Sequence, residues 1–393
     1  MLCTKCKGKL LCGKVECPLL KKFNFLKSLK VDNELENPTP PSVFVGRIGY
    51  PKVYTGPLVA LDPSSDVRYL DSPWLWNCSI EDIIRIRTSM LRTTKRIDVN
   101  IPSNPNEYLL KVQEVTASIK PIEIDAKLIK VNKKLTFDDT MQPMGFNAIV
   151  EKLEVVENPK IPRKVEKVYY DDVKATDAVV YLKKSGFSTY YLQKLLSIGM
   201  FGERKNRRLV PTRWSITAVH EMLSNWLKRE VSVFESVDKH LLFNYEHFGN
   251  HFEILLSPGD FSFQLIEIWI KKSLWSPDKT WIEADGEDLT AKKGYSTLGG
   301  GYYAAKLPVL EHLYKLKKRA SVLVVREVKP EYYAPLGVWV VEEGIKNALN
   351  KKPDVFEDFE SALNTLSNRI LTSRKLWEKH LVKNRQTTLF NFM

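Results

Sequence analysis

The sequence contains no apolar run long enough to cross a bilayer, which takes about 20 predominantly apolar residues. Its most apolar segments, 320–325 and 337–341, are short and strand-like. A secretory signal is also missing, so we expect an intracellular, cytoplasmic protein with no membrane partner. Internal repeats and low-complexity tracts are absent as well, so nothing in the sequence indicates a repeat array or a fibrous protein.

Cysteine is scarce, and its distribution is uneven. Of five cysteines, four lie in the first 17 residues: Cys3, Cys6, Cys12 and Cys17. A secreted disulfide framework would be spread over the fold. Four closely spaced thiolates instead predict a C4-type structural zinc site, and metal would supply the folding energy of a module too short to bury a core. Free cysteines and an iron–sulfur cluster are the alternatives.

Acidic residues are outnumbered, with 47 Asp and Glu against 60 Lys and Arg, giving a formal net charge of +13. This excess favours a polyanionic partner, nucleic acid first, although Lys-rich surfaces also occur in heat-adapted proteins. The length of 393 residues and the hydrophobic fraction of 44% indicate two or three domains with proper cores.

Strand-like and helix-like patterns are mixed along the chain, so we expect an α+β fold with mixed sheets and helices. The proline- and lysine-containing segment 158–167 is the best internal boundary. The expected domains are a zinc module at 1–20, an α+β domain at 21–160, an α+β domain at 161–382 and an extended tail at 383–393. Residues 356–382 read as one long final helix, because apolar residues recur on one face.

In the first half, residues 43–45 read as a strand entering a loop that contains Gly46, Arg47 and Gly49. The glycines allow a close approach of the backbone, and the guanidinium group could bind a phosphate. A tight hairpin turn without a ligand is the alternative.

A capping-box pattern at Ser79 predicts a helix that continues through residue 96. Arg87 falls on its apolar stripe, so we expect it to pair with a buried carboxylate, such as Glu114 or Glu123, or to line a cleft. Three other arginines would share a second helix face that could track a phosphate backbone or simply face solvent: Arg85, Arg92 and Arg96. From 108 to 131 the pattern reads as strands.

In the second half, 204–208 is the densest cationic segment, with Arg204, Lys205, Arg207 and Arg208. Arg213 and Trp214 follow directly before a helix with an apolar stripe. Cations and an aromatic ring at a helix start are typical of a nucleic-acid site, although a solvated basic loop is the alternative. The glycines at 299–301 precede Tyr302, which could stack on a base.

Four carboxylates in the second half could converge on Mg²⁺: Glu267, Glu311, Glu327 and Glu343. Such a cluster would indicate a metal-dependent nuclease or another DNA-modifying enzyme. This enzyme hypothesis is the alternative to a non-catalytic DNA-binding factor.

The last eight residues contain Gln386, Leu389, Phe392 and Met393. One helical turn would place Leu389 and Phe392 on the same side, and Gln386 can form hydrogen bonds at a pocket rim. The pattern resembles the PIP-type peptide by which replication and repair proteins bind the sliding clamp (PCNA), with Met393 in place of a second aromatic residue.

Together, several segments resemble the archaeal Nre family of DNA repair proteins over essentially the whole chain. They are the N-terminal cysteines, 44–47, 142–145, 210–217, 299–303, 337–339 and the final peptide. The resemblance implies a role in the repair of DNA damage, a C4 zinc finger and binding to the archaeal sliding clamp. We therefore expect a repair factor at the nucleoid that is tethered to the clamp. It would bind DNA through Arg47, Arg87 and Arg213, the 204–208 loop, the helix face with Arg85 and Arg92, and the glycine-rich loops with Tyr302.

Overall fold

The computed structural model describes residues 6, 8–10, 15–17, 20, 31–62, 64–133, 144–290 and 292–381. Cys3 and Cys12 of the predicted zinc module lie outside these residues, as does the predicted clamp peptide. Both therefore stay predictions. No helix of the described part is long and apolar enough to cross a membrane.

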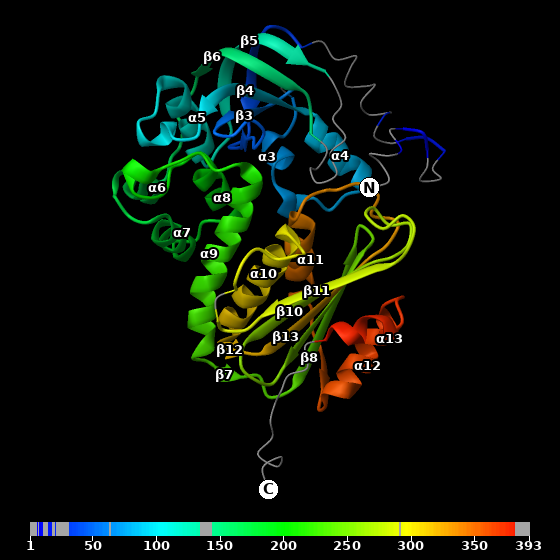
Figure 1. The fold of residues 1–393 in the computed structure, drawn as a ribbon. Coiled ribbons are helices and arrows are strands. Elements are labelled where there is room, and N and C mark those ends of the chain that lie inside the picture. The colour runs from blue at the N-terminus through cyan, green and yellow to red at the C-terminus, as the bar shows by residue number, and fades with distance from the viewer. Residues whose placement is uncertain are drawn as a thin grey trace. The chain divides into compact units, whose positions relative to one another are not determined.

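The chain divides into two compact units. Unit 1 comprises Met1–Trp226 and Ala334–Glu343, and unit 2 comprises Leu227–Tyr333 and Gly344–Met393. Residues 161–226, assigned on the sequence to the C-terminal domain, belong to unit 1. Each unit combines helices with a mixed six-stranded sheet (Figure 1), which confirms the predicted α+β class.

The sheet of unit 1 has the strand order β1-β5-β6-β4-β3-β2. The strands are β1 (Glu34–Thr39), β2 (Val43–Val45), β3 (Lys52–Ala60), β4 (Met90–Asp98), β5 (Ile122–Asn132) and β6 (Asn147–Val155). Only the β4–β6 pair is parallel among these neighbours. Alternate residues of β5 are buried, as expected for a strand with one face on the core.

Helices of unit 1 cover this sheet and extend beyond it. They are α3 (Val67–Leu70), α4 (Ile80–Thr88), α5 (Glu107–Ala117), α6 (Arg163–Tyr170), α7 (Ala175–Lys184), α8 (Thr189–Ser197) and α9 (Thr212–Ser232), the last of which continues into unit 2. Helix α5 contacts β3, β6 and α8. Helices α7 and α8 are each followed by a glycine with a positive φ angle, 93° at Gly186 and 71° at Gly199, as is common at helix C-termini.

For two segments of unit 1, the predicted type of secondary structure was wrong. The capping box at Ser79 is present, but α4 ends at Thr88 and the chain continues as β4, which pairs with β3 on one side and β6 on the other. Sheet pairing thus overrides the helical spacing of the arginines. Residues 107–117, which read as strand-like, form α5, whose first turn is capped by the Asn106 side chain.

The sheet of unit 2 has the order β11-β10-β13-β9-β8-β14, with β10 and β13 parallel. The strands of the unit are β7 (Glu235–Ser236), β8 (His240–His247), β9 (Asn250–Ser257), β10 (Ser262–Trp269), β11 (Trp281–Glu287), β12 (Lys318–Arg319), β13 (Ser321–Val328) and β14 (Asp354–Phe356). Strands β8 and β9 form a hairpin around Gly249. Its helices are α10 (Gly300–Leu316), α11 (Trp339–Leu349, which begins in unit 1), α12 (Phe359–Arg369) and α13 (Arg374–Trp377).

Both faces of this second sheet are buried. One face packs Leu255, Ile266 and Val325 against Leu363 and Leu366 of α12. On the other face, α10 lies along the strands, and Figure 1 shows α10 and α12 on opposite sides of the sheet.

The C-terminal helix predicted for 356–382 is interrupted. Helix α12 ends at Arg369, and α13 begins only at Arg374. Between them, the backbone N–H groups of Leu371 and Thr372 each donate a hydrogen bond of 2.8 Å to the buried carboxylate of Glu327. A buried carboxylate needs such donors, which a continuous helix would not supply.

Candidate nucleic-acid interface

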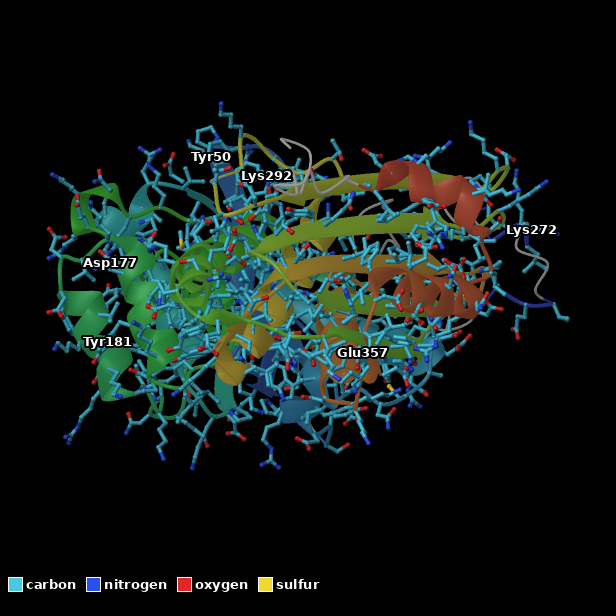
Figure 2. All side chains as sticks on the ribbon, turned by 90° about the horizontal axis from the view of Figure 1, so that it is seen from below. Tyr50, Asp177, Tyr181, Lys272, Lys292 and Glu357 are labelled. Atoms are coloured by element: carbon cyan, nitrogen blue, oxygen red, sulfur yellow. The ribbon has the colours of Figure 1, made fainter. Side chains whose placement is uncertain are left out.

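The turn between β2 and β3 carries the first predicted site residue to the surface. The N–H of Gly46 donates to the carbonyl of Tyr54 (2.8 Å), so the hairpin closes tightly and the following residues project from it. Arg47 is exposed and Tyr50 is 47% exposed. Figure 2 shows Tyr50 at the surface of the molecule. The predicted hairpin thus exists, and it presents a cation and an aromatic ring together.

The start of α9 lies beside this turn. The N–H of Val45 donates to Oγ1 of Thr212 (2.9 Å). Trp214 lies two residues after Thr212, and its ring centroid is 5.8 Å from that of Tyr50 in the turn. Trp214 is 48% exposed. Arg213 is exposed as well. The structure therefore brings together the turn that carries Arg47 and the helix start that carries Arg213, 166 positions later in the sequence.

A third arginine completes this surface. The Nε of Arg96 donates to the backbone carbonyl of Lys52 (3.4 Å). Its Nη2 would lie 3.1 Å from a Cβ atom on Gly49, so the guanidinium covers the glycine of the turn. Arg96 is exposed. We call Arg47, Tyr50, Arg96, Arg213 and Trp214 the aromatic–cation surface.

This combination suits a nucleic-acid strand. Exposed aromatic rings stack on bases, and each base–aromatic contact contributes about 1–3 kcal/mol. Guanidinium groups bind phosphate oxygens, often with two parallel hydrogen bonds. Because stacking needs an accessible base face, the arrangement favours unpaired over paired bases.

Arg87 does not belong to this surface. It is buried and forms an ion pair with Asp71 (2.9 Å), which Lys194 also contacts (2.7 Å). Burial works to raise the pKa of Asp71, but the two cations outweigh it and lower that pKa. The expected burial and pairing are confirmed, whereas the suggested partners, Glu114 and Glu123, were wrong.

Arg85 and Arg92, predicted on one helix face, lie in different elements. Arg85 is exposed on α4 and pairs with Asp82 (3.0 Å). Arg92 is half-buried on β4, 5.2 Å from the ring centroid of Phe44, and Nη2 donates to the carbonyl of Gly145 (3.3 Å). Burial, with Arg87 nearby, lowers the pKa of Arg92 to about 10. Its guanidinium thus packs against Phe44 and the Gly145 carbonyl, and a phosphate contact by Arg92 stays a prediction.

The arginines of the 204–208 segment also differ in exposure. Arg204 and Arg208 are exposed, as predicted. Arg207 is buried: Nε donates to the carbonyl of Gly202 (2.8 Å), Nη2 donates to that of Tyr169 (2.6 Å), and the guanidinium lies 4.8 Å from the Tyr169 ring centroid. It fixes the loop and cannot contact DNA there.

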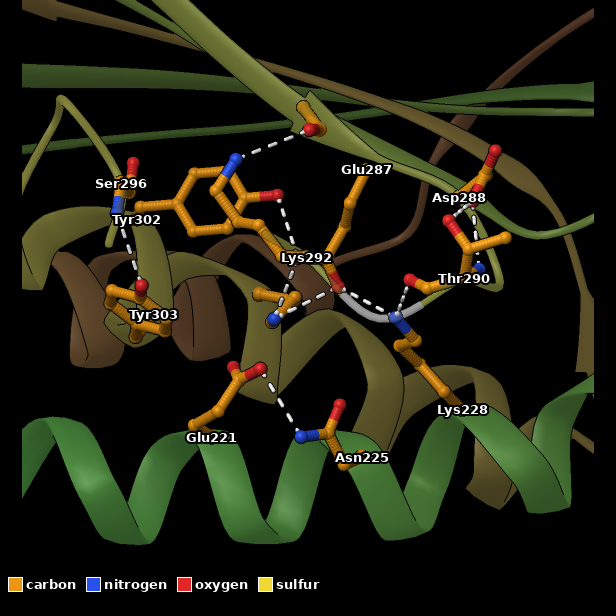
Figure 3. A network of polar contacts seen from close by, with 12 residues as sticks. Glu221, Asn225, Lys228, Glu287, Asp288, Thr290, Lys292, Ser296, Tyr302 and Tyr303 are labelled. Atoms are coloured by element: carbon orange, nitrogen blue, oxygen red, sulfur yellow. Dashed lines mark hydrogen bonds and ion pairs between the residues drawn. The ribbon is translucent and has the colours of Figure 1, made fainter. Parts of the chain in front are cut away.

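Tyr302 was also predicted at the interface, and the structure contradicts this. It is 0% exposed in unit 2, and its hydroxyl donates to Glu287 (3.1 Å). Glu287 also accepts from Lys228 (2.9 Å) and Lys306 (2.9 and 3.0 Å). Figure 3 shows the contact of Glu287 with Lys228. The glycine-rich segment thus begins a buried helix, and no base can reach this ring.

The four candidate metal carboxylates do not converge. Glu267 on β10 forms an ion pair with Arg326 (2.7 Å), its register partner on the neighbouring strand β13. Glu327, the next residue of β13, therefore points to the opposite face of the sheet. Glu343, in unit 1, accepts from the Tyr190 hydroxyl (2.7 Å), and Glu311 lies on α10. Within the described ranges, no group of three or more His, Cys, Asp or Glu could hold a metal ion.

Arg96 is a functional candidate that was predicted on a helix but lies on strand β4. The helical spacing of Arg85, Arg92 and Arg96 concealed a second pattern, in which Arg92 and Arg96 share one face of a strand with the β-branched pair Thr93 and Thr94 between them. That local preference for a strand was the available signal.

The sequence matches two protein-family models. A model described as Archaeal Nre, N-terminal, matches residues 11–276, and one described as Archaeal Nre, C-terminal, matches residues 287–392. The chain belongs to the archaeal Nre family. None of the solved structures matches it.

Curated Nre relatives cover nearly the full length. DNA repair protein NreA of Archaeoglobus fulgidus is 57% identical over 99% of this chain and 98% of its own. DNA repair protein NreB of the same organism is 34% identical over 100% of both chains. DNA repair protein NreA of Haloferax volcanii is 34% identical over 85% of this chain and 82% of its own. The Nre resemblance read from the motifs is thereby confirmed.

Proposed function

We propose that this protein is a DNA repair factor that binds DNA through the aromatic–cation surface and is held at the sliding clamp by its C-terminal peptide. The observation that carries the DNA contact is the pairing of Tyr50 with Trp214 on two segments that also present the exposed Arg47 and Arg213. The names of the Nre relatives support the repair role. We accordingly place the protein inside the cell, at the nucleoid.

The clamp contact rests on the sequence of residues 386–393. Leu389 and Phe392 would enter a hydrophobic pocket on the clamp, Gln386 would bond at its rim, and Met393 would add an apolar contact. Tethering raises the local concentration of the protein at the clamp to the millimolar range for a short flexible link. A DNA site of modest affinity is then sufficient.

The N-terminal cysteines fit this proposal as a structural zinc module. Four thiolates at one tetrahedral centre leave no open position for a substrate. The zinc would therefore order the segment and present its lysines to phosphates, without a catalytic role.

The DNA contact is tested by replacing Arg47 and Arg213 together with alanine. We expect at least tenfold weaker binding of single-stranded and forked DNA, because two phosphate contacts are removed. The slope of log K against log salt concentration should fall by about two, one per contact. Fluorescence anisotropy over a salt series measures both quantities.

The matched control is the double variant Lys271→Ala/Lys279→Ala, which removes two exposed cations from unit 2. It lowers the net charge equally, so any general charge effect appears in both variants. Equal DNA affinity and equal salt slope in the two double variants would refute the proposed surface.

A further inference from the structure

A pocket of about 320 Å³ opens at the surface of unit 1. Its apolar lining includes Ala175 of α7, Leu196 of α8 and Phe201. Its polar lining includes Glu203, Asn206 and Arg208. The volume lies at the lower end of the range for ligand pockets, roughly 300–1,000 Å³. A ligand in it would therefore meet both apolar and polar side chains.

The loop that forms the polar side is held in shape before any ligand arrives. The buried guanidinium of Arg207 bonds the carbonyl of Gly202, which itself lines the pocket. The N–H of Arg204 donates to the carboxylate of Asp172 (2.6 Å). A preformed pocket loses little free energy to ordering when a ligand binds. This gives Arg207 a positioning role in place of the predicted DNA contact.

The polar edge matches the hydrogen-bonding edge of a nucleobase. The Nδ2 of Asn206 donates to Oε2 of Glu203 (3.0 Å), so the amide and the carboxylate stand side by side. Asn pairs with the N6 and N7 atoms of adenine, and a Glu carboxylate accepts from the amino group of cytosine. Lys174 and Arg208, both exposed at the pocket, can bind the flanking phosphates.

The pocket lies close to the aromatic–cation surface along the chain. Val210 lines the pocket, and Trp214 is four residues further on. Four residues span at most about 14 Å, which corresponds to about four nucleotides at 3.4 Å of rise each. A DNA strand that contacts Trp214 can therefore also reach the pocket.

We propose that this pocket accepts a single nucleobase turned out of the DNA helix. Proteins that read an extruded base stack it on apolar side chains and bond its polar edge, and extrusion is easiest at an unpaired or damaged position. The pocket would thus let the protein distinguish duplexes with an unpaired base from fully paired ones. The inference rests on the proposed DNA-binding function and adds to it the structure that is recognised.

The test compares a duplex containing one unpaired adenine with the matched duplex. Wild-type protein should bind the first at least fivefold more tightly. Ala175→Leu fills the pocket without changing a charge, and it should reduce this ratio to about one while leaving the affinity for matched duplex unchanged. Asn206→Ala should lower the ratio through loss of the base edge. Thr176→Leu, in the next position of α7 and outside the pocket lining, should behave as wild type.

The outcomes separate the two proposals. If the wild-type ratio is one, or if Ala175→Leu keeps the wild-type ratio, the pocket proposal is wrong while DNA binding stands. If the pocket binds adenosine monophosphate and the unpaired duplex gains nothing, its ligand is a free nucleotide and extrusion is refuted. If the wild type binds neither duplex nor single strand, the proposed function itself fails, and the pocket proposal fails with it.

Discussion

Inside unit 2, the carboxylate of Glu287 accepts hydrogen bonds from the ammonium groups of Lys228 and Lys306 and from the Tyr302 hydroxyl. Its side chain is 3% exposed and that of Lys306 is 0% exposed. Lys228 bonds both the Glu287 carboxylate and the carbonyl of Thr290. These contacts join α9, α10 and β11 through one anion, so removal of its charge takes this anionic partner away from two buried cations.

We predict that Glu287→Gln lowers the free energy of unfolding by about 3–5 kcal/mol, the usual effect of breaking a buried ion pair from one side. Urea unfolding, followed by tryptophan fluorescence, measures the change. Glu235→Gln is the control, because its side chain is 88% exposed and pairs with Lys318 only at the surface, where ion pairs contribute little. Similar midpoints for both variants would show that the network is not needed for stability.

His251 links two carboxylates on the β8–β9 hairpin. Its ring nitrogens lie 3.1 Å from Glu246 and 2.7 Å from Glu253. Burial disfavours the charged ring, but the hydrogen bonds to Glu253 and Glu246 outweigh burial and raise the pKa of His251. Lys329 pairs with Glu246, and Arg369 lies near Glu253.

A raised histidine pKa stabilises the fold at low pH and not at high pH. The contribution is complete below the unfolded-state pKa of about 6.5 and is lost as pH rises through the higher folded-state pKa. We therefore expect His251→Gln to reduce the melting temperature more at pH 6 than at pH 9. Calorimetric scans of both proteins at the two pH values measure this, and a reduction independent of pH would contradict it.

Single-residue environments were predictable only in part. The apolar stripe around Arg87 predicted its burial, since an arginine among isoleucines has to be paired. Its partner was not predictable, because Asp71 lies 16 residues earlier in an irregular segment next to α3. Arg207 resembles its exposed neighbours Asn206 and Arg208 in sequence, and only tertiary packing buries it. Tyr302 lies in a buried helix whose glycine-rich start resembles a loop in sequence.

At the scale of elements, the sequence predicted the start of α4 correctly and its end incorrectly. Capping at Ser79 acts over a few residues and was read correctly. The β4 strand and the break after α12 depend on distant partners, namely the neighbouring strands and the carboxylate of Glu327. Such long-range competition leaves no trace in local periodicity.

The N-terminal zinc module is an element whose folding we expect to depend on metal. We predict one zinc per chain by elemental analysis and its loss in Cys3→Ser, because three thiolates bind a structural zinc far more weakly than four. Cys78→Ser is the matched control, since the Cys78 thiol accepts from the Tyr69 hydroxyl (3.6 Å) in unit 1. Iron with visible absorbance, or full zinc in Cys3→Ser, would overturn the assignment.

At the scale of the whole molecule, the chain passes between its units more than once. It leaves unit 1 at Trp226, returns for Ala334–Glu343 and leaves again within α11. Both passages out of unit 1 run inside helices, so no proline- or glycine-rich linker marks them. For this reason, composition predicted a domain boundary at 158–167, a segment that lies within unit 1.

The clamp peptide has to act separately from the DNA surface if the protein is a tethered repair factor. We predict that Leu389→Ala/Phe392→Ala abolishes co-elution with the sliding clamp, because both apolar anchors of the peptide are lost. The spacer variant Thr387→Ala/Asn391→Ala should retain co-elution. DNA affinity without the clamp should be the same in both variants and in wild type.

On clamp-loaded DNA, the anchor variant should bind no more tightly than it binds DNA alone, whereas wild type gains the effective concentration of the tether, a factor of about 10²–10⁴. The aromatic–cation variant Arg47→Ala/Arg213→Ala should show the converse, retaining the clamp and losing DNA. Co-elution that survives in the anchor variant would move the clamp contact to another part of the chain. Loss of DNA affinity in that variant would mean that the peptide and the DNA surface are not independent, and the tether model would fail.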